Sequence, residues 1–300
     1  MKLTIVCTVL LAICCYAVAP SDAQACGCTE AAIGRKRRGA GGHPLVPGFD
    51  KNHKRFGKEP PGQVKKRDGL FMVADMLLLE KDARNFGHSH KKQKRSGTPL
   101  VTDQQKQTYL WKNNTVPWIF SAAGTGITYQ TVESALAAFQ AKLGNCIKFQ
   151  RITSTAGVSN YVKVINGGEG SCYSYVGSVG GMQELSLGTY CDLPVIAQHE
   201  FMHALGFYHE HNRPDRDTAV TIVKEKILTD YCDNFEICKT CKTYAPYNTR
   251  GIMQYPSYAF GCQYEHNTIL RKSDPTNLID YNEVIQDSDV TAIKSLYGCN

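Results

Sequence analysis

The pattern of apolar and polar positions predicts helices and short strands in the second part of the chain. Residues 129–143 repeat apolar side chains at intervals of three and four residues, and Gly144 follows them, so this stretch predicts an amphipathic helix. Helices are also expected at 193–205 and 288–296. Short apolar runs predict strands at 116–120, 146–152, 161–165 and 184–187. Strands and helices that do not alternate regularly indicate an α+β fold.

The first residues have the features of a targeting segment. An apolar run at 3–19 is followed by the small-residue site Ala23-Gln24-Ala25, which is typical of a secretory signal peptide cut before Cys26. No later stretch is long and apolar enough to span a bilayer. We therefore expect a signal peptide at 1–25 and a secreted, extracellular protein with no membrane span.

Charge divides the rest of the chain in two. Residues 26–95 carry 17 Lys and Arg against 7 Asp and Glu, whereas residues 96–300 carry 16 against 19. The formal net charge of +7 therefore belongs to the first segment, whose low hydrophobicity predicts that most of it is disordered in isolation. We expect a basic prosegment at 26–95 and one globular domain at 96–300, with no basic surface for nucleic acid.

Basic runs mark candidate processing sites in the prosegment. They lie at 35–38, 65–67 and 91–95. Processing proteases cut cationic sites in exposed chain, and the last run lies where the composition changes. We predict that a processing protease cuts near Arg95, the alternative being an ordinary solvated charge run.

A histidine-rich stretch contains the candidate chemistry. His199 and His203 are four residues apart, so on a helix their rings project from one face and can bind one metal ion. Gly206 can end the helix in a left-handed conformation, which brings His209 in as a third ligand. Three imidazoles suit zinc and leave a position for water, within reach of Glu200. The alternative is an amphipathic helix with two surface histidines, and the added glycine and third histidine disfavour it.

The string 199–209 is a metzincin signature, and the residues after it resemble one family of that clan. Glu210 and the run Arg213-Pro-Asp-Arg-Asp217 make the chain similar to the astacin zinc metalloendopeptidases. The similarity extends from Leu110 to Cys299. It implies an α+β domain with a twisted, mostly antiparallel-edged five-stranded sheet and two helices in its first half. The second half would be irregular and disulfide-stapled, with one late helix.

The resemblance implies roles for the residues of this stretch. His199, His203 and His209 would bind one zinc ion per subunit, and Glu200 would act as general base and then as general acid. Tyr255 matches a tyrosine that ligates zinc at rest and then stabilises the tetrahedral intermediate. We therefore expect a zinc-dependent endopeptidase, a monomer, that acts on proteins or peptides.

Further positions match the family or depart from it. Met253 matches the Met-turn residue beneath the metal, and Gln254 stands where a histidine that is not a ligand is common. Glu210 matches a carboxylate that contacts the mature N-terminus through buried water. Astacin prosegments offer an aspartate that displaces the catalytic water, and the nearest match is Asp75, a ligand in the zymogen only. The resemblance therefore predicts a zymogen that is activated by removal of the basic segment.

Cysteines are concentrated in the domain. Of 13 cysteines, three lie in the signal segment, two directly after it, and eight from residue 146 onward, which predicts four disulfides in an oxidising compartment. The resemblance pairs Cys146 with Cys299 and Cys172 with Cys191. The remaining four are expected to form two pairs of undetermined connectivity, the alternative being a second zinc site. They are Cys232, Cys238, Cys241 and Cys262.

Several alternatives remain open from the sequence. Cys26 or Cys28 is a rival latency ligand, or the two pair with each other. Asn113 begins a glycosylation sequon. A catalytically silent binding protein on the same scaffold is the rival to an enzyme. Segment 26–95 could also be a product itself, a cationic peptide released at its basic runs.

Overall fold

The computed structural model of the protein describes residues 26–28, 70–73, 75–79, 109–122, 127–168, 170–263 and 265–299. The predicted signal peptide, the three basic runs and Arg95 lie outside the described residues. Within the described part, no helix combines the length and the apolar character needed to cross a membrane.

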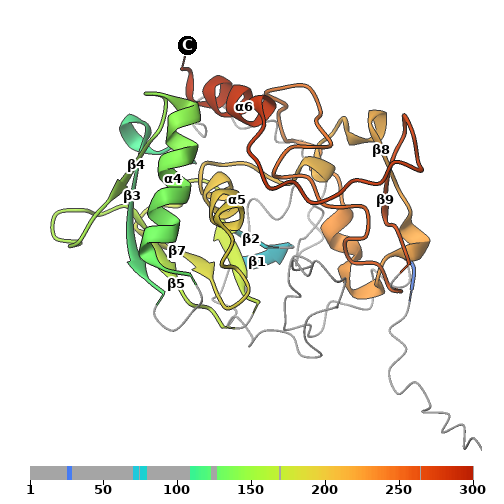
Figure 1. The fold of residues 1–300 in the computed structure, drawn as a ribbon, viewed down its shortest axis with the longest axis horizontal. Helices are drawn as coiled ribbons and strands as arrows, with labels where there is room; N and C mark the ends of the chain where they lie inside the picture. Colours follow the sequence, from blue (N-terminus) through green and yellow to red (C-terminus); the bar gives the residue numbers. More distant parts are fainter. Residues whose placement is uncertain are drawn as a thin grey trace, which may run out of the picture.

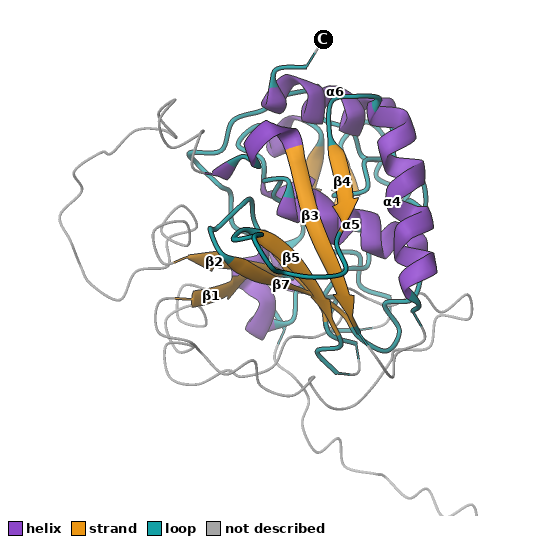
Figure 2. Ribbon diagram, turned by 90° about the vertical axis from the view of Figure 1, so that its left-hand side faces the viewer, coloured by secondary structure: helices purple, strands orange, loops and turns teal. Residues whose placement is uncertain are grey.

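The first half of the domain is a sheet with two helices on one of its faces (Figures 1 and 2). The β5 strand pairs in parallel with β3 and β7, and only β6 is antiparallel to its neighbour β7. This confirms the α+β class and the five strands, including β6, which the apolar pattern missed. The strands are β3 (Thr115–Ser121), β4 (Lys148–Arg151), β5 (Tyr161–Ile165), β6 (Cys172–Tyr175) and β7 (Met182–Leu187); the helices are α4 (Tyr129–Leu143) and α5 (Pro194–Ala204).

The apolar face of α4 packs against α5 and the sheet. Thr128 caps the start of α4 by accepting a hydrogen bond from the Thr131 backbone N–H at 3.1 Å. Phe139 is buried in the main hydrophobic cluster of the domain, where Trp118 and Phe201 meet edge to face at 6.3 Å. Burial of each such aromatic side chain stabilises the fold by about 1.5–3 kcal/mol. This cluster fixes α5, the helix that carries the histidines.

The prosegment extends this sheet from five strands to seven. Its apolar stretch forms a hairpin of β1 (Leu70–Val73) and β2 (Met76–Leu79), and β2 pairs in parallel with β6. Met76 and Leu78 are buried against the domain. The hairpin forms because the domain supplies both an open strand edge and an apolar surface, so the expectation of a five-stranded sheet holds for the domain without its prosegment.

The second half of the domain is irregular (Figure 1). A small sheet pairs two short strands, and a second hydrophobic cluster forms around Phe235 and Phe260. The late helix is present and is capped at its start by reciprocal bonds between Gln286 and Asp289. Its elements are η3 (Glu210–Asn212), η4 (Arg216–Thr218), β8 (Val220–Ile222), η5 (Lys224–Lys226), η6 (Thr229–Phe235), β9 (Ile269–Arg271) and α6 (Asp287–Tyr297); the short η2 (Lys112–Asn114) precedes the sheet.

Both disulfides implied by the resemblance are present. Cys146 is bonded to Cys299 and Cys172 to Cys191. The first joins the start of β4 to the end of α6, and the second joins β6 to the loop before α5. The two halves of the domain are thus linked covalently at the end of the chain.

The expected pairing of the other four cysteines is only partly right. Cys238 and Cys241 bond to each other, but the remaining two bond to the prosegment. Their partnerships are Cys26–Cys262 and Cys28–Cys232. The prediction of two disulfides within the four is therefore wrong, as is the pairing of Cys26 with Cys28. All four are oxidised, so they form no second zinc site.

Candidate metal centre

Helix α5 presents two histidines on one face. The ring centroids of His199 and His203 are 4.8 Å apart, as expected for residues one helical turn apart. The helix ends because Gly206 adopts a φ of +108°, a value that disfavours side chains with a Cβ atom. The chain then reverses, and the Phe207 N–H donates back to Met202 O at 3.2 Å. This turn brings His209 to 4.7 Å from His203, measured between ring centroids.

The imidazole rings are oriented by backbone carbonyl groups. His199 Nδ1 lies 2.7 Å from Ile252 O, and His203 Nδ1 lies 2.7 Å from Phe207 O. If these Nδ1 atoms carry the protons, both Nε2 atoms keep a free lone pair. Burial lowers the pKa of His203 and lowers that of His209 to about 4. The two rings are therefore neutral at pH 7, as metal ligands must be.

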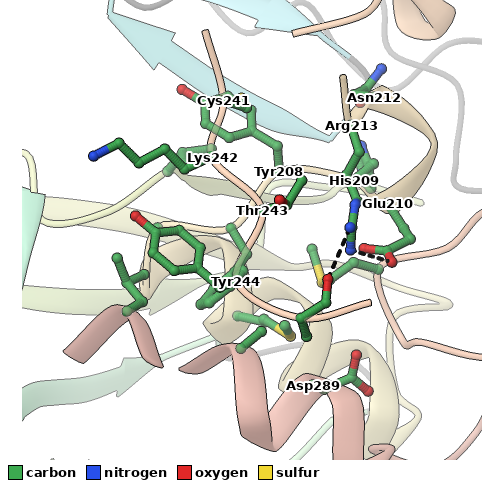
Figure 3. A pocket seen from close by; sticks show the side chains of 18 of the residues that line it. Tyr208, His209, Glu210, Asn212, Arg213, Cys241, Lys242, Thr243, Tyr244 and Asp289 are labelled. Atoms are coloured by element: carbon green, nitrogen blue, oxygen red, sulfur yellow. Dashed lines mark hydrogen bonds and ion pairs between the residues drawn. The ribbon is translucent and has the colours of Figure 1, made fainter. Parts of the chain in front are cut away.

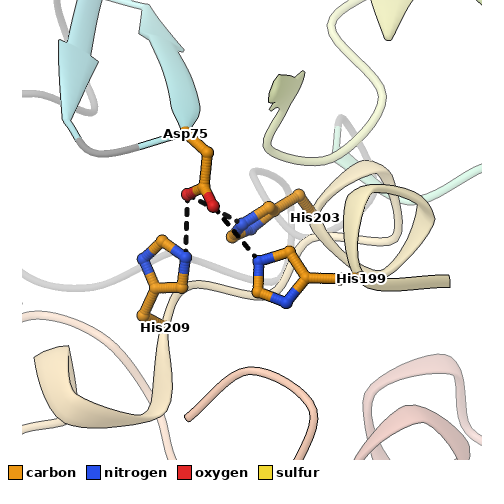
Figure 4. Close-up of side chains that lie close together, drawn as sticks. All are labelled: Asp75, His199, His203 and His209. Carbon is orange, nitrogen blue, oxygen red and sulfur yellow. Dashed lines mark ion pairs between the residues drawn. The ribbon is translucent and has the colours of Figure 1, made fainter. Parts of the chain in front are cut away.

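Asp75 points from the β1–β2 turn into this group of imidazoles (Figure 4). Its carboxylate oxygens lie 2.8 Å from His209 Nε2, 3.3 Å from His199 Nε2 and 3.4 Å from His203 Nε2. Burial alone would raise the pKa of Asp75, but the contacts with the three histidines hold that pKa well below its ordinary value. The sequence-predicted zymogen ligand and the three predicted histidines are thus brought together.

The donor set fits a zinc ion. One nitrogen of each histidine and one oxygen of Asp75 lie within 4.8 Å of one another, and all four residues are buried. The three Nε2 atoms and both carboxylate oxygens have no hydrogen-bond partner among the described residues. Buried polar atoms without partners are unfavourable unless something binds them. Three imidazole nitrogens and one oxygen are a combination that zinc takes, so this buried group can hold the ion.

Two further predicted residues lie buried beside the histidines. Neither carboxylate oxygen of Glu200 has a hydrogen-bond partner among the described residues. Burial and the negative charge of Asp75 raise the pKa of Glu200 well above its ordinary value. The ring of Tyr255 lies 4.4 Å from that of His209, and its hydroxyl is also buried and unpartnered within the described part of the chain. Burial, Asp75 and Glu200 together raise the pKa of Tyr255.

The predicted Met-turn contacts the backbone of the site. Met253 is buried, and its carbonyl accepts a hydrogen bond of 2.9 Å from the Glu210 N–H. The preceding residue, Ile252, supplies the carbonyl next to His199. The turn therefore contacts both His199, the first histidine, and Glu210, the residue directly after the third histidine.

Gln254, which departs from the family pattern, is hydrogen-bonded on both sides of its amide group. Its Oε1 accepts a hydrogen bond of 2.6 Å from the Tyr247 hydroxyl, and its Nε2 donates to the Tyr255 carbonyl at 2.8 Å. The glutamine thus fixes the backbone from which the Tyr255 side chain projects.

Glu210 lies at a cavity next to the third histidine (Figure 3). Its Oε1 accepts hydrogen bonds of 2.9 Å from Arg213 Nη1 and from the Asn248 N–H. Burial raises the pKa of Glu210 to about 7 despite Arg213. The cavity has a volume of about 160 Å³, and Tyr109, where the described part of the domain begins, also lines it. The mature N-terminus that Glu210 is predicted to contact lies outside the described residues.

Two residues near the site were not identified from the sequence. His211 Nε2 lies 2.9 Å from Asn234 O, and its ring is 4.4 Å from that of Tyr255. Its place directly after the metzincin signature was the available signal. Asp289 on α6 accepts a hydrogen bond of 3.3 Å from the Ile252 N–H, which ties the last helix to the Met-turn. No motif in the sequence indicates that contact.

Comparison with known proteins identifies the family. The family model Astacin (Peptidase family M12A) matches residues 103–298. Meprin A subunit beta of Rattus norvegicus is 38% identical over 162 residues, which is 53% of this chain and 22% of the relative. Zinc metalloproteinase nas-12 of Caenorhabditis elegans is 38% identical over 192 residues, 63% of this chain and 48% of the relative. The chain belongs to the astacin family of zinc metalloendopeptidases.

A solved structure shows the same fold. High choriolytic enzyme 1, a hatching enzyme zinc-protease from Oryzias latipes, superposes with a TM-score of 0.58 at 33% identity. The match covers 65% of this chain and 96% of that one. In sequence, this chain covers 66% of the complete length of High choriolytic enzyme 1, so it spans from about a fifth to about two thirds of the length of these three curated relatives.

Proposed function

We propose that this protein is a secreted zinc endopeptidase, made as a zymogen and activated by removal of the basic prosegment, which includes a processing cut near Arg95. The observation that carries the proposal is Asp75, a prosegment residue whose carboxylate lies 2.8 Å from His209 Nε2 in the candidate metal centre. A ligand supplied by a removable segment is a direct means of latency. The apolar run at 3–19 and the five disulfides among the described residues support secretion.

The hairpin supports latency in a second way. The β2 strand pairs with β6, which would otherwise be an edge of the domain sheet. An open strand edge next to a catalytic site can bind an extended peptide through its backbone groups. The prosegment therefore occupies both the metal centre and the neighbouring strand edge, and its departure exposes both.

The residues of the site account for peptide hydrolysis. Zinc, when bound by the three histidines, supplies a Lewis acid that makes water acidic near neutral pH. The Glu200 carboxylate takes the proton from the attacking water and passes it to the leaving amine. The Tyr255 hydroxyl donates a hydrogen bond to the carbonyl oxygen as that oxygen becomes negative. Burial is the larger cause of the raised pKa of Glu200 and the charge of Asp75 adds to it, so the departure of Asp75 lowers that pKa.

Two predictions from the sequence remain part of the proposal. Glu210, at the cavity beside His209, would receive the new N-terminus once the chain is cut. Asn113 is exposed, which is consistent with glycosylation of its sequon. The substrates are proteins or peptides.

The test is activation of the purified secreted chain by a protease specific for paired basic residues. We expect no peptidase activity before cutting, activity afterwards, loss of activity on chelation and recovery with added zinc. The control is Glu200→Gln, which should be cut identically and should bind one zinc ion without becoming active. An active Glu200→Gln variant, or a processed wild type that binds zinc and cleaves no peptide, would overturn the proposal.

The latency role of Asp75 has its own test. Asp75→Ala should raise the activity before any cut above that of the wild-type zymogen, because the site loses its blocking carboxylate, but it should stay below that of the processed enzyme, because β2 still covers the β6 edge. The matched control is Asp50→Asn, a change to another aspartate of the same segment, which should leave the zymogen silent. Equal basal activity in the two variants would rule out Asp75 as the blocking residue.

A further inference from the structure

The first residues of the prosegment are bonded to the far half of the domain. Cys26 is bonded to Cys262, 236 residues away, and Cys28 to Cys232, 204 residues away. In Figure 1 this short blue stretch lies beside the irregular second half, well apart from the cyan β1–β2 hairpin. The prosegment is therefore attached in two places, covalently at its start and through β2 further along.

This attachment is a built part of the fold. The Gly27 N–H donates to Ile227 O at 2.9 Å, and the Cys28 N–H donates to Lys224 O at 3.1 Å. Gly27 adopts a φ of +97°, a conformation that residues with a Cβ atom rarely take. A glycine at this position lets the two flanking cysteines reach η6 and the loop that contains Cys262.

The attachment changes what a cut near Arg95 achieves. Hydrolysis there breaks one peptide bond, consumes one water and leaves both disulfides intact. The whole segment from residue 26 to the cut would stay bonded to Cys232 and Cys262. A tethered ligand rebinds at an effective concentration far above that of a free peptide in dilute solution. Asp75 would therefore remain at the metal centre after a single cut.

Building on the proposed zymogen, we propose that activation needs a second cut between Cys28 and Leu70. The mature enzyme is then a two-chain molecule that keeps a short N-terminal peptide, bonded through Cys26 and Cys28. Basic runs at 35–38 and 65–67 and the pair Lys54-Arg55 lie in this interval. The two cuts release a fragment that carries the β1–β2 hairpin and Asp75.

The retained peptide has a role in the mature domain. Cys28 packs against the second hydrophobic cluster, which also contains Tyr255 and Phe260. One of its two disulfides ends at Cys232, a member of that cluster, and the other at Cys262, two residues after Phe260. The peptide thus stabilises the half of the domain that positions Tyr255, and full removal of segment 26–95 would leave two unpaired cysteines in its place.

Attachment is tested on the Glu200→Gln variant, so that the result does not depend on peptidase activity. The secreted zymogen is cut to completion by a protease specific for paired basic residues, and its intact mass is measured with and without reductant. We expect a peptide that contains Cys26 and Cys28 to accompany the domain without reductant and to separate from it with reductant. A processed domain that lacks this peptide before reduction would overturn the proposal.

The need for the second cut is tested in the active chain. Neutralising the basic residues at 35–38, 54–55 and 65–67 to Gln leaves the run near Arg95 as the one paired basic site of segment 26–95. This variant should be cut there, yet remain at least about tenfold less active than fully processed wild type, since the tethered hairpin rebinds. Full activity of the singly cut form would contradict the proposal.

Two companion variants separate the causes. Restoring only the run at 65–67 should restore activity with both disulfides intact. Adding Cys26→Ser and Cys28→Ser to the neutralised chain should let a single cut suffice, if that variant folds. If restoring 65–67 leaves the singly cut level of activity unchanged, the second cut is not the limiting step. A third outcome is that the intact mass shows the attached peptide but no processed form has activity. That result would refute the proposed peptidase function and would leave the two-chain structure supported.

Discussion

The two halves of the catalytic domain are held together by different interactions. The first half depends on strand pairing and on a large apolar cluster between α4, α5 and the sheet. The second half has little regular structure, and its smaller apolar cluster around Phe235 and Phe260 is supplemented by disulfides and by buried polar side chains. Asn212, for example, donates to Asn234 O at 2.9 Å and to Glu236 O at 2.8 Å, and Arg216 donates to His211 O at 3.0 Å.

The candidate metal centre lies where these halves meet. Helix α5 of the first half contributes His199, Glu200 and His203, while His209 and Tyr255 come from the second. The first half therefore supplies a rigid helical frame, and the second supplies groups whose positions depend on individual hydrogen bonds. Changes of equal size in the two halves should consequently have different effects on stability and on activity.

The largest effect is expected from the catalytic groups themselves. In the activated enzyme, Glu200→Gln should lower kcat/KM by about 10³-fold or more, because the proton acceptor is lost. Tyr255→Phe should lower it by about 10²-fold, since one oxyanion donor is lost. The measurement is steady-state cleavage of a peptide substrate, with zinc content as the control. Equal losses of kcat/KM in the two variants would contradict the expected difference between loss of the proton acceptor and loss of one oxyanion donor.

Stability of the first half is tested by opening its core. Phe139→Ala should lower the free energy of unfolding by about 3–5 kcal/mol, because a large cavity replaces a fully buried ring. Denaturant unfolding of the zymogen measures the loss. Met182→Ala, which removes a half-exposed side chain of the same sheet, is the matched control and should change the value by about 0.5 kcal/mol or less.

Stability of the second half is tested by removing a polar contact. Asn212→Ala removes one donor from two backbone carbonyls, of which Asn234 O keeps its contact with His211 Nε2, and should destabilise the protein by about 1–3 kcal/mol. Because His209 is three residues away, kcat/KM should also fall. Asn160→Ala, which removes a hydrogen bond of 2.8 Å to Ser178 in the first half, is the control and should leave kcat/KM unchanged. An equal kcat/KM loss in both variants would argue against a separate role for the second half.

The smallest expected effect is a pH dependence of stability that is caused by Asp289, the α6 residue that is hydrogen-bonded to the Met-turn. Burial raises the pKa of Asp289 to about 6, although the N–H groups of Gln286 and Ile252 lower it. The folded state therefore binds this proton more tightly than the unfolded state, so its stabilisation is present below the unfolded pKa near 4 and is lost as pH rises through 6. Between those pH values, wild type should lose about 1–2 kcal/mol of stability relative to Asp289→Asn. The measurement is the free energy of unfolding of both proteins against pH. Parallel profiles would show that Asp289 does not cause the loss of stability.

The elements that followed periodicity were the ones predicted well. Helix α4 has the bounds expected from its apolar spacing, and α5 and α6 differ from the expected ranges by one residue at each end. Helices α4 and α6 pack one face on the core, so their sequences repeat with the helical period, whereas α5 is buried at every position from Val195 to Ala204. The β6 strand was missed because Cys172–Tyr175 is buried at three of its four positions and shows no alternation.

Cysteine partners were the main error. The family-matched pair Cys146–Cys299 was obtained by resemblance, and spacing alone would not have given it. Cys26 and Cys28 were separated from the domain by a long basic segment, so sequence distance argued against their actual partners, Cys262 and Cys232. Disulfide connectivity depends on which thiols are close in space, and that proximity is set by the whole fold.

The sequence by itself determined the local chemistry. The four-residue spacing of His199 and His203 and the turn at Gly206 follow from helix geometry, which is a property of neighbouring residues. Only the tertiary structure decided that Asp75 reaches the same histidines and that the start of the prosegment is bonded to the second half of the domain. Those contacts join residues more than a hundred positions apart, and their formation depends on an open strand edge and on buried surfaces that exist only after the domain has folded.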